Sequence, residues 1–113
     1  MAVTIYHNPR CTKSRQTLAL LEKKGVKPNV VEYLETPPSP AELKRILKML
    51  GMTPRQLLRK KEAKEAGLDD ARLSDDALIE KMAANPIVIE RPIVVKGSKA
   101  ALGRPPENVL DIL

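Results

Sequence analysis

The spacing of hydrophobic positions changes several times along the chain, and each change marks a predicted element. The β-branched and aromatic run Val3–Tyr6 predicts a first strand, which ends at Asn8-Pro9 because proline blocks its continuation. From Thr12 to Lys24 the spacing becomes helical, and residues 29–34 predict a second strand. A strand, a helix and a strand within about thirty residues form a βαβ unit, so we expect the two strands to be parallel.

The middle of the chain predicts helices with clear start signals. Ser39-Pro40-Ala41-Glu42 combines the spacing of a capping box with a proline at the first helical position. By the same logic Thr53-Pro54 predicts a second, shorter helix, which carries Arg55 to Arg59. Ser74 predicts the cap of a third helix, which ends at Asn85-Pro86.

The last third returns to strands. Pro92–Val95 predicts a strand, Lys96-Gly97-Ser98 a turn, and Lys99–Leu102 its antiparallel partner, before Pro105-Pro106 begins a C-terminal helix. The order β-α-β, helices, β-β-α is the thioredoxin-like arrangement. We therefore predict an α/β fold with a mixed four-stranded sheet and a helical insertion at about residues 39–85, between the βαβ and ββα halves.

The composition narrows the class of protein. The chain has 113 residues, 42% hydrophobic and 30% charged, which predicts one globular domain over residues 1–113. No apolar run approaches the ~20 residues of a transmembrane helix, and Met1–His7 lacks the pattern of a signal peptide. With one cysteine and one histidine, the chain cannot form an internal disulfide or a Cys/His zinc site. We therefore expect a cytoplasmic protein with no metal and no membrane contact.

The formal net charge of +6 admits two interpretations. The cations can be spread over a solvated surface, or some of them can bind an anionic ligand. Nucleic acid is disfavoured as that ligand, because only 2% of the residues are aromatic and no groove-reading motif is present. Where the cations lie in the fold therefore decides the question.

Cys11 is the strongest candidate for chemistry. It directly precedes the first predicted helix, where unpaired N–H groups and the helix dipole favour thiolate over thiol. Arg10, Lys13 and Arg15 add cations to its flanks. A lone cysteine is more often an inert buried residue, but polar and cationic flanks favour a reactive thiolate here.

The spacing around Cys11 restricts the kind of nucleophile. Ser14 stands where a C-x-x-C motif has its second thiol, so an external thiol must resolve any oxidised intermediate. Thr17 stands where a phosphatase-type loop has its arginine. Arg15, four residues after Cys11, lies on the same face of the helix.

Several segments resemble one protein family. The segment Tyr6–Arg15 is similar to the active-site segment of the ArsC family, the arsenate reductases that work with glutathione and glutaredoxin. The similarity continues in the same order to the end of the chain, through residues 33–38, 55–60, 91–95 and 103–105. The chain resembles a short branch of this family; longer members carry a further C-terminal segment, whereas this sequence ends at Leu113.

The resemblance implies a role for particular residues. It makes Cys11 the nucleophile and assigns oxyanion binding to Arg59, Arg91 and Arg104. Planar guanidinium groups suit a tetrahedral oxyanion, because they donate paired, charge-assisted hydrogen bonds. The supporting residues implied are His7, Ser14, Arg15 and Pro92, with Pro92 in a cis peptide bond and His7 near the thiolate. Other cations, among them Arg55, Lys60, Lys61 and Lys64, are interpreted as surface residues.

The resemblance also implies a reaction. Arsenate is reduced to arsenite through a covalent adduct on Cys11, with glutathione as co-substrate and glutaredoxin as redox partner. No bound cofactor and no metal are implied, and we expect a monomer.

Two alternatives share the same residues. The first is a glutathione-dependent thiol reductase that uses Cys11 on mixed disulfides and does not reduce arsenate. The second is an Spx-like regulator that binds RNA polymerase. Such regulators are similar to this chain at Arg91-Pro92, but they typically carry a C-x-x-C switch, which Ser14 removes.

Overall fold

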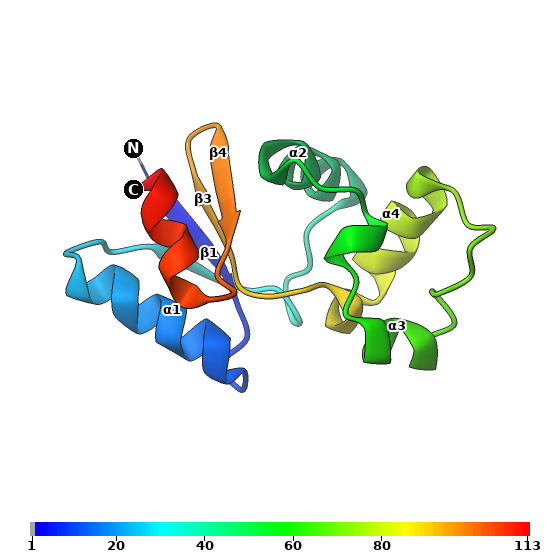
Figure 1. Ribbon diagram of the computed structural model, residues 1–113, viewed down its shortest axis with the longest axis horizontal. Helices are drawn as coiled ribbons and strands as arrows, with labels where there is room; N and C mark the ends of the chain where they lie inside the picture. The colour runs from blue at the N-terminus through cyan, green and yellow to red at the C-terminus, as the bar shows by residue number, and fades with distance from the viewer. Residues whose placement is uncertain (1) are drawn as a thin grey trace. The chain divides into compact units, whose positions relative to one another are not determined.

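The computed structural model describes residues 2–113, and the chain divides into two compact units (Figure 1). The sheet unit combines the described residues up to Thr36 with Arg91–Leu113. The helical unit is Pro37–Glu90. The helical unit is therefore an insertion between the two segments that form the sheet unit.

The sheet unit contains four strands: β1 (Val3–His7), β2 (Asn29–Glu32), β3 (Ile93–Lys96) and β4 (Lys99–Leu102). Their order in the sheet is β2-β1-β3-β4. β1 runs parallel to β2 and antiparallel to β3, and β3 pairs antiparallel with β4. The predicted mixed four-stranded sheet is confirmed, and so is the parallel βαβ unit.

Two helices cover one face of this sheet, α1 (Thr12–Lys23) and the 3-10 helix η3 (Pro106–Ile112), which lie side by side in Figure 1. Side chains alternate between the faces of a strand, so Val3 and Ile5 share the face that meets the helices. They form a buried cluster with Leu21, Val94 and Val109. Burial of each such side chain contributes about 1.5–3 kcal/mol, which fixes α1 on the sheet.

Two details of the sheet unit differ from the prediction. β2 ends at Glu32 instead of residue 34, because the Glu32 carbonyl accepts the N–H groups of Glu35 (3.0 Å) and Thr36 (2.9 Å) and closes a turn. The turn leaves the Tyr33 side chain buried, with 2% of its surface exposed. The C-terminal helix is a 3-10 helix, in which the N–H of Asn108 donates to the carbonyl of Pro105 (3.0 Å).

The helical unit contains α2 (Pro40–Leu50), η1 (Arg55–Leu57), α3 (Lys60–Glu65), α4 (Asp75–Ala84) and η2 (Pro86–Val88). Both predicted N-caps are confirmed: the hydroxyl of Ser39 accepts the N–H of Glu42, and that of Ser74 accepts the N–H of Ala77, each at 3.1 Å. α2 ends at Gly51, whose φ of 67° is the left-handed conformation typical of a helix end.

The helix predicted after Thr53-Pro54 is wrong in its extent. It is a single 3-10 turn, η1, after which Leu58 is extended and forms a bridge with Ile89. The N–H of Arg59 donates to the carbonyl of Val88 (2.7 Å), and Arg59 becomes the N-cap of α3. The backbone here finds its hydrogen bonds in a distant segment, which local sequence spacing does not reveal.

Candidate active site

Cys11 lies in the short loop between β1 and α1 and is the N-cap residue of α1. Its N–H donates to the carbonyl of Asn8 (3.0 Å), and its carbonyl accepts the N–H of Arg15 (3.0 Å). Its extended backbone, with φ −91° and ψ 124°, is the usual conformation of an N-cap. The side chain is partly exposed, so a substrate can reach the thiol.

The surroundings of Cys11 favour its ionised form. Burial raises the pKa of the thiol, but the N–H of Ser14, the guanidinium of Arg91 and the N–H of Lys13 lower it by more, so the pKa lies below its ordinary value. Neither N–H group meets the geometry of a full capping hydrogen bond, so both act as helix-start dipoles close to sulfur. A thiolate is the stronger nucleophile, which suits Cys11 for covalent chemistry.

The cation that acts on Cys11 is not one of the neighbouring cations that the sequence suggests. The Arg15 guanidinium donates to the carbonyl of Pro9 (3.0 Å) and the hydroxyl of Thr12 (3.3 Å) and remains exposed. Lys13 acts through its backbone N–H, and the cation beside the thiol is Arg91. Residues adjacent in sequence therefore supply backbone dipoles, while the charge comes from the other half of the sheet unit.

His7 and Ser14 form a buried, hydrogen-bonded pair on either side of Cys11 in the sequence. Nδ1 of His7 lies 2.7 Å from Oγ of Ser14, which also accepts the N–H of Asn8 at 3.0 Å. Burial lowers the pKa of His7, and Arg15 lowers it further against the opposing effect of Glu32. The lowered pKa favours the neutral ring of His7, and the hydrogen bond to Ser14 Oγ holds the ring in place.

Arg91 and Pro92 bring the second half of the chain to the thiol. The peptide bond between them is cis, as the family resemblance implied. Burial lowers the pKa of Arg91, but Cys11 and Tyr33 raise it by more, so the guanidinium stays charged. Its Nε and Nη1 atoms are buried and have no hydrogen-bond partner among the described residues. A partly buried cation that lies beside a nucleophile and has two donor atoms without a partner is an arrangement that an anion would complete.

Arg104 is placed next to Arg91. Its Nη1 donates to the carbonyl of Arg91 (2.9 Å), and the N–H of Gly103 donates to the carbonyl of Pro92 (2.9 Å). The Arg104-Pro105 bond is also cis, which the sequence reasoning did not foresee. These contacts bring Cys11, Arg91 and Arg104 together in the sheet unit.

Gly103 holds this arrangement in close packing and was missed by the sequence reasoning. A Cβ at this position would lie 2.6 Å from Oγ1 of Thr17 and 2.8 Å from Cγ of Pro92, both too close for any side chain. Thr17 is fully buried on α1, and its hydroxyl donates to the carbonyl of Lys13 (2.8 Å). The sequence did offer a signal for this residue, because Gly103 stands between a predicted strand and the Arg104-Pro105 pair.

Arg59, the third predicted anion ligand, lies in the helical unit. Its Nε and Nη1 atoms form ion pairs with Glu62 and Glu90, each at 3.2 Å. About a fifth of each side chain is exposed, 21% for Arg59 and Glu62 and 24% for Glu90. Two carboxylates that the sequence reasoning did not consider therefore already bind this guanidinium.

The described part of the chain contains neither a metal-binding cluster nor a membrane-spanning helix. Across residues 2–113, no three His, Cys, Asp or Glu side chains gather where they could hold a metal ion. No helix in that range is long and apolar enough to cross a membrane.

The fold and this site together define a class. A βαβ and ββα sheet with one nucleophilic cysteine candidate at the start of its first helix is typical of a thioredoxin-like protein. The model of the ArsC family matches residues 6–112. The chain belongs to the ArsC family.

Relatives with known sequences or structures match over almost the whole chain. "Uncharacterized protein YfgD" of Escherichia coli is 57% identical over 114 residues, which cover 98% of this chain and 96% of that protein. An arsenate reductase of Haemophilus influenzae is 49% identical over 116 residues, and all of both chains is covered. The solved structure of an arsenate reductase from Vibrio cholerae has a TM-score of 0.95 at 56% identity, with 100% of this chain and 98% of that chain covered. The thioredoxin-like fold is therefore confirmed.

Proposed function

We propose that this protein is an arsenate reductase, an oxidoreductase that converts arsenate to arsenite with Cys11 as nucleophile. The observation that carries the proposal is the pairing of a partly exposed thiol of lowered pKa with the unused donors of Arg91. Relatives that share about half of its residues bear the name arsenate reductase. An arsenate ion offers the negative oxygens that Arg91 and Arg104 require.

The first step forms a covalent adduct. The Cys11 thiolate attacks arsenic, a sulfur–arsenic bond forms, and one arsenate oxygen leaves as water after taking up protons. Arg91 and Arg104 hold the remaining oxygens and stabilise their charge during the exchange. The N–H groups of Lys13 and Ser14 at the start of α1 support the same anion.

The reducing equivalents come from thiols outside the chain. Glutathione replaces a second arsenate oxygen, which leaves as water, so that arsenic carries the sulfur of Cys11 and the sulfur of glutathione. A glutaredoxin thiol then attacks the glutathione sulfur and forms a mixed disulfide with it, and the two electrons of the broken sulfur–arsenic bond stay on arsenic. Water hydrolyses the remaining bond between Cys11 and arsenic(III), which releases arsenite and returns the Cys11 thiol. Two features support an external thiol: Cys11 is the only cysteine, and Ser14 is fully buried and bonded to His7. Glutathione is therefore proposed as co-substrate and glutaredoxin as partner.

Arsenite production tests the proposal directly. The purified protein, arsenate, glutathione and glutaredoxin should give arsenite, measured by separation of the two arsenic oxyanions. Cys11→Ser should give none, and omission of glutaredoxin should stop the reaction after the adduct. Absence of arsenite from the complete mixture overturns the proposal.

A parallel assay distinguishes arsenate reduction from the thiol reductase alternative. A glutathione mixed disulfide is offered in place of arsenate, and release of glutathione is followed. Turnover of that substrate without any arsenite would favour the thiol reductase. The donors of Arg91 beside the thiol favour arsenate, because the negative oxygens of arsenate are attached to the atom that Cys11 attacks, whereas the carboxylates of a glutathione mixed disulfide lie several bonds away from its sulfur.

A further inference from the structure

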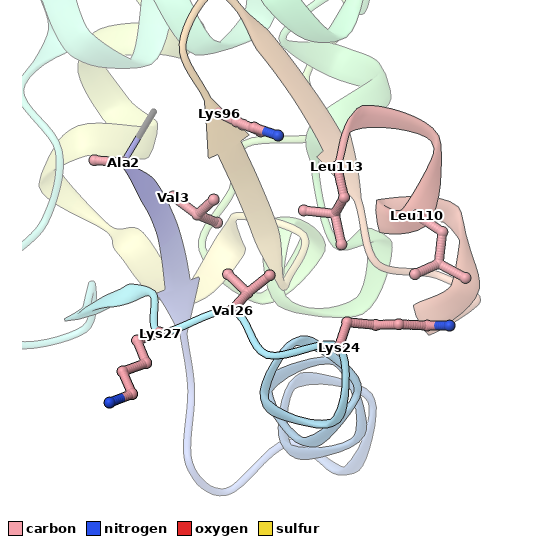
Figure 2. A pocket seen from close by; sticks show the side chains of 8 residues that line it. All are labelled: Ala2, Val3, Lys24, Val26, Lys27, Lys96, Leu110 and Leu113. Atoms are coloured by element: carbon pink, nitrogen blue, oxygen red, sulfur yellow. The ribbon is translucent and has the colours of Figure 1, made fainter.

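The two ends of α1 are connected to the sheet in different ways. At the C-terminal end a backbone bond closes the connection, in which the N–H of Gly25 donates to the carbonyl of Glu22 (3.0 Å). The side chains of Lys24, Val26 and Lys27 at this end line an open pocket of about 700 Å³ (Figure 2). At the N-terminal end, where the thiol lies, side chains hold the backbone as well.

This N-terminal end begins with a β-turn, residues 8–11, that leads from β1 into α1. The N–H of Cys11 donates to the carbonyl of Asn8 (3.0 Å) and closes the turn. Asparagine at the first position and proline at the second favour such a turn. Cys11 is its last residue and also the N-cap of α1. The orientation of the turn therefore decides how the thiol lies relative to the N–H groups of the helix start.

The central peptide group of the turn, between Pro9 and Arg10, is held on both sides by side chains. Its N–H donates to Oδ1 of Asn8 (3.0 Å), and its carbonyl oxygen accepts Nη1 of Arg15 (3.0 Å). The orientation of the central peptide is what distinguishes one type of β-turn from another. Because both of its polar atoms are bound, this peptide group cannot rotate without the loss of two hydrogen bonds.

Asn8 is the buried residue of this turn, with 4% of its surface exposed, whereas Pro9 and Arg10 are exposed. Burial of a polar side chain costs free energy unless hydrogen bonds replace its contact with water. The backbone N–H of Asn8 also donates to Oγ of Ser14 (3.0 Å). Asn8 therefore connects the end of β1 to the turn and to the first turn of α1.

The alignment of the thiol matters because the groups that act on it come from two directions. The N–H groups of Lys13 and Ser14 belong to α1, whereas the Arg91 guanidinium lies just before β3. The cation that lowers the pKa of Cys11 is this guanidinium. The bond to the turn therefore explains the position of Arg15 better than an effect of its charge on the thiol does.

We propose that Asn8 is a positioning residue for the nucleophile, and that Arg15 completes its hold on the Pro9–Arg10 peptide. Together they aim the Cys11 thiol before a substrate arrives. A reacting group that is already in place lowers the barrier, and a misplacement of about 1 Å can cost about 100-fold in rate. The kinetic effect rests on the proposed arsenate reduction, whereas the thiol of the free protein tests the role of Asn8 independently.

Thiolate absorbance as a function of pH, in the full chain without arsenate, tests Asn8. Asn8→Ala removes the acceptor for the Arg10 N–H, so the thiol becomes less well aligned with the helix start. The ionisation constant of Cys11 should fall about threefold to tenfold, the effect of about one lost hydrogen bond. Asn8→Ser keeps a shorter acceptor and should recover part of this loss. An unchanged ionisation constant in Asn8→Ala overturns the proposal.

Asp70→Ala is the matched control for a bond of the same kind. Oδ1 of Asp70 accepts the N–H of Arg72, two residues further on, at 2.9 Å in the helical unit. The control should leave the ionisation constant of Cys11 unchanged, and a fall equal to that of Asn8→Ala contradicts the proposal. If Asn8→Ala does not fold, as judged by circular dichroism, Asn8→Ser and the Arg15 variant carry the same test.

Arg15→Met removes the second hold on the same peptide group. It should lower the ionisation constant of Cys11, and its combination with Asn8→Ala should give less than the sum of the two changes. Arg10→Met removes an equal charge next to Cys11, leaves both bonds to the peptide in place and should have a smaller effect. An equal effect of Arg10→Met would assign the change to charge, and this result or full additivity of the pair contradicts the proposal.

Arsenate turnover gives a second measurement. Arg91 and Arg104 still bind the anion in Asn8→Ala, so kcat should fall about tenfold while KM changes little. A rise in KM with unchanged kcat contradicts a role in aiming the thiol. Absence of arsenite with the parent protein would overturn the proposed function alone, because thiolate absorbance still reports on Asn8 and Arg15.

Discussion

Arg91 and Arg59 carry the same side chain in two different settings. In the sheet unit, two buried donor atoms of Arg91 have no hydrogen-bond partner among residues 2–113, and the guanidinium lies beside a thiol of lowered pKa. In the helical unit, Arg59 donates the equivalent atoms to Glu62 and Glu90. The difference teaches that two arginines matched to the same role in the sequence can have different surroundings in the fold. The carboxylates around each arginine decide how much charge remains for a ligand.

Among the arginine variants, the largest loss is expected from Arg91→Ala. Charge-assisted hydrogen bonds contribute about 1.5–3 kcal/mol each, so kcat/KM for arsenate should fall about 100-fold. Initial rates of arsenite formation measure this. The control is Arg45→Ala, which removes an exposed arginine of α2. Equal activity of both variants would break the contrast between Arg91 and an ordinary surface arginine.

The pH profile of the same variant sharpens the comparison. The thiolate is the reactive form, so the rate rises with pH through the pKa of Cys11 and then levels off. Burial raises that pKa, while the Ser14 N–H and the Arg91 guanidinium lower it. Without Arg91 the rise should move to higher pH, which thiolate absorbance also measures. An unchanged midpoint would show that Arg91 does not act on the thiol.

Arg104→Ala should have the next largest effect. The variant removes a cationic partner of the anion and the hydrogen bond to the Arg91 carbonyl. We expect kcat/KM to fall about tenfold, the size of one charge-assisted contact. Arg104→Lys should recover only part of the loss, because lysine keeps the charge but not the planar fork. Full activity of the alanine variant would remove Arg104 from the site.

Gly103→Ala tests whether close packing holds the two arginines in place. The new methyl group meets Thr17 and Pro92, so we expect a stability loss of about 1–3 kcal/mol, measured by denaturant unfolding. Thr17→Ala removes part of the clash and should recover some stability in the double variant. If Gly103→Ala is as stable as the parent protein, the loop that contains Gly103 can move aside, and close packing does not hold the arginines in place.

Arg59→Gln should have the smallest effect, because Glu62 and Glu90 already balance its charge. We expect kcat/KM to fall no more than about threefold. A loss in Arg59→Gln as large as in Arg91→Ala would make the two arginines equivalent and end the contrast.

Local signals in the sequence predicted most of the fold. The caps at Ser39 and Ser74 and the strand at Val3 depend on neighbouring residues, and all three are confirmed. The extended segment at Leu58 was missed because its partner is Ile89, thirty-one positions further along the chain. Short-range spacing contains no information about such a contact.

The sequence predicts the candidate nucleophile of the site, but it does not predict which charged groups surround Cys11 and Arg59. Cys11 stands out because of its position before a helix. The cation beside it, Arg91, lies eighty positions away in the sequence, so chain proximity pointed to Arg15 instead. The carboxylates on Arg59 were equally invisible, because Glu90 reaches it only through the fold of the helical unit.

The insertion of the helical unit also has a consequence for synthesis. The central strand β1 pairs with β3, and Tyr6 lies opposite Ile93, eighty-seven positions later. At about 5–20 residues per second, a ribosome needs about 4–17 s to produce that partner. During this interval β1 has one unpaired edge, while the helical unit already has most of its own contacts available. The nascent chain is therefore most vulnerable to aggregation before residue 93 emerges, and faster synthesis of the insertion would shorten that exposure.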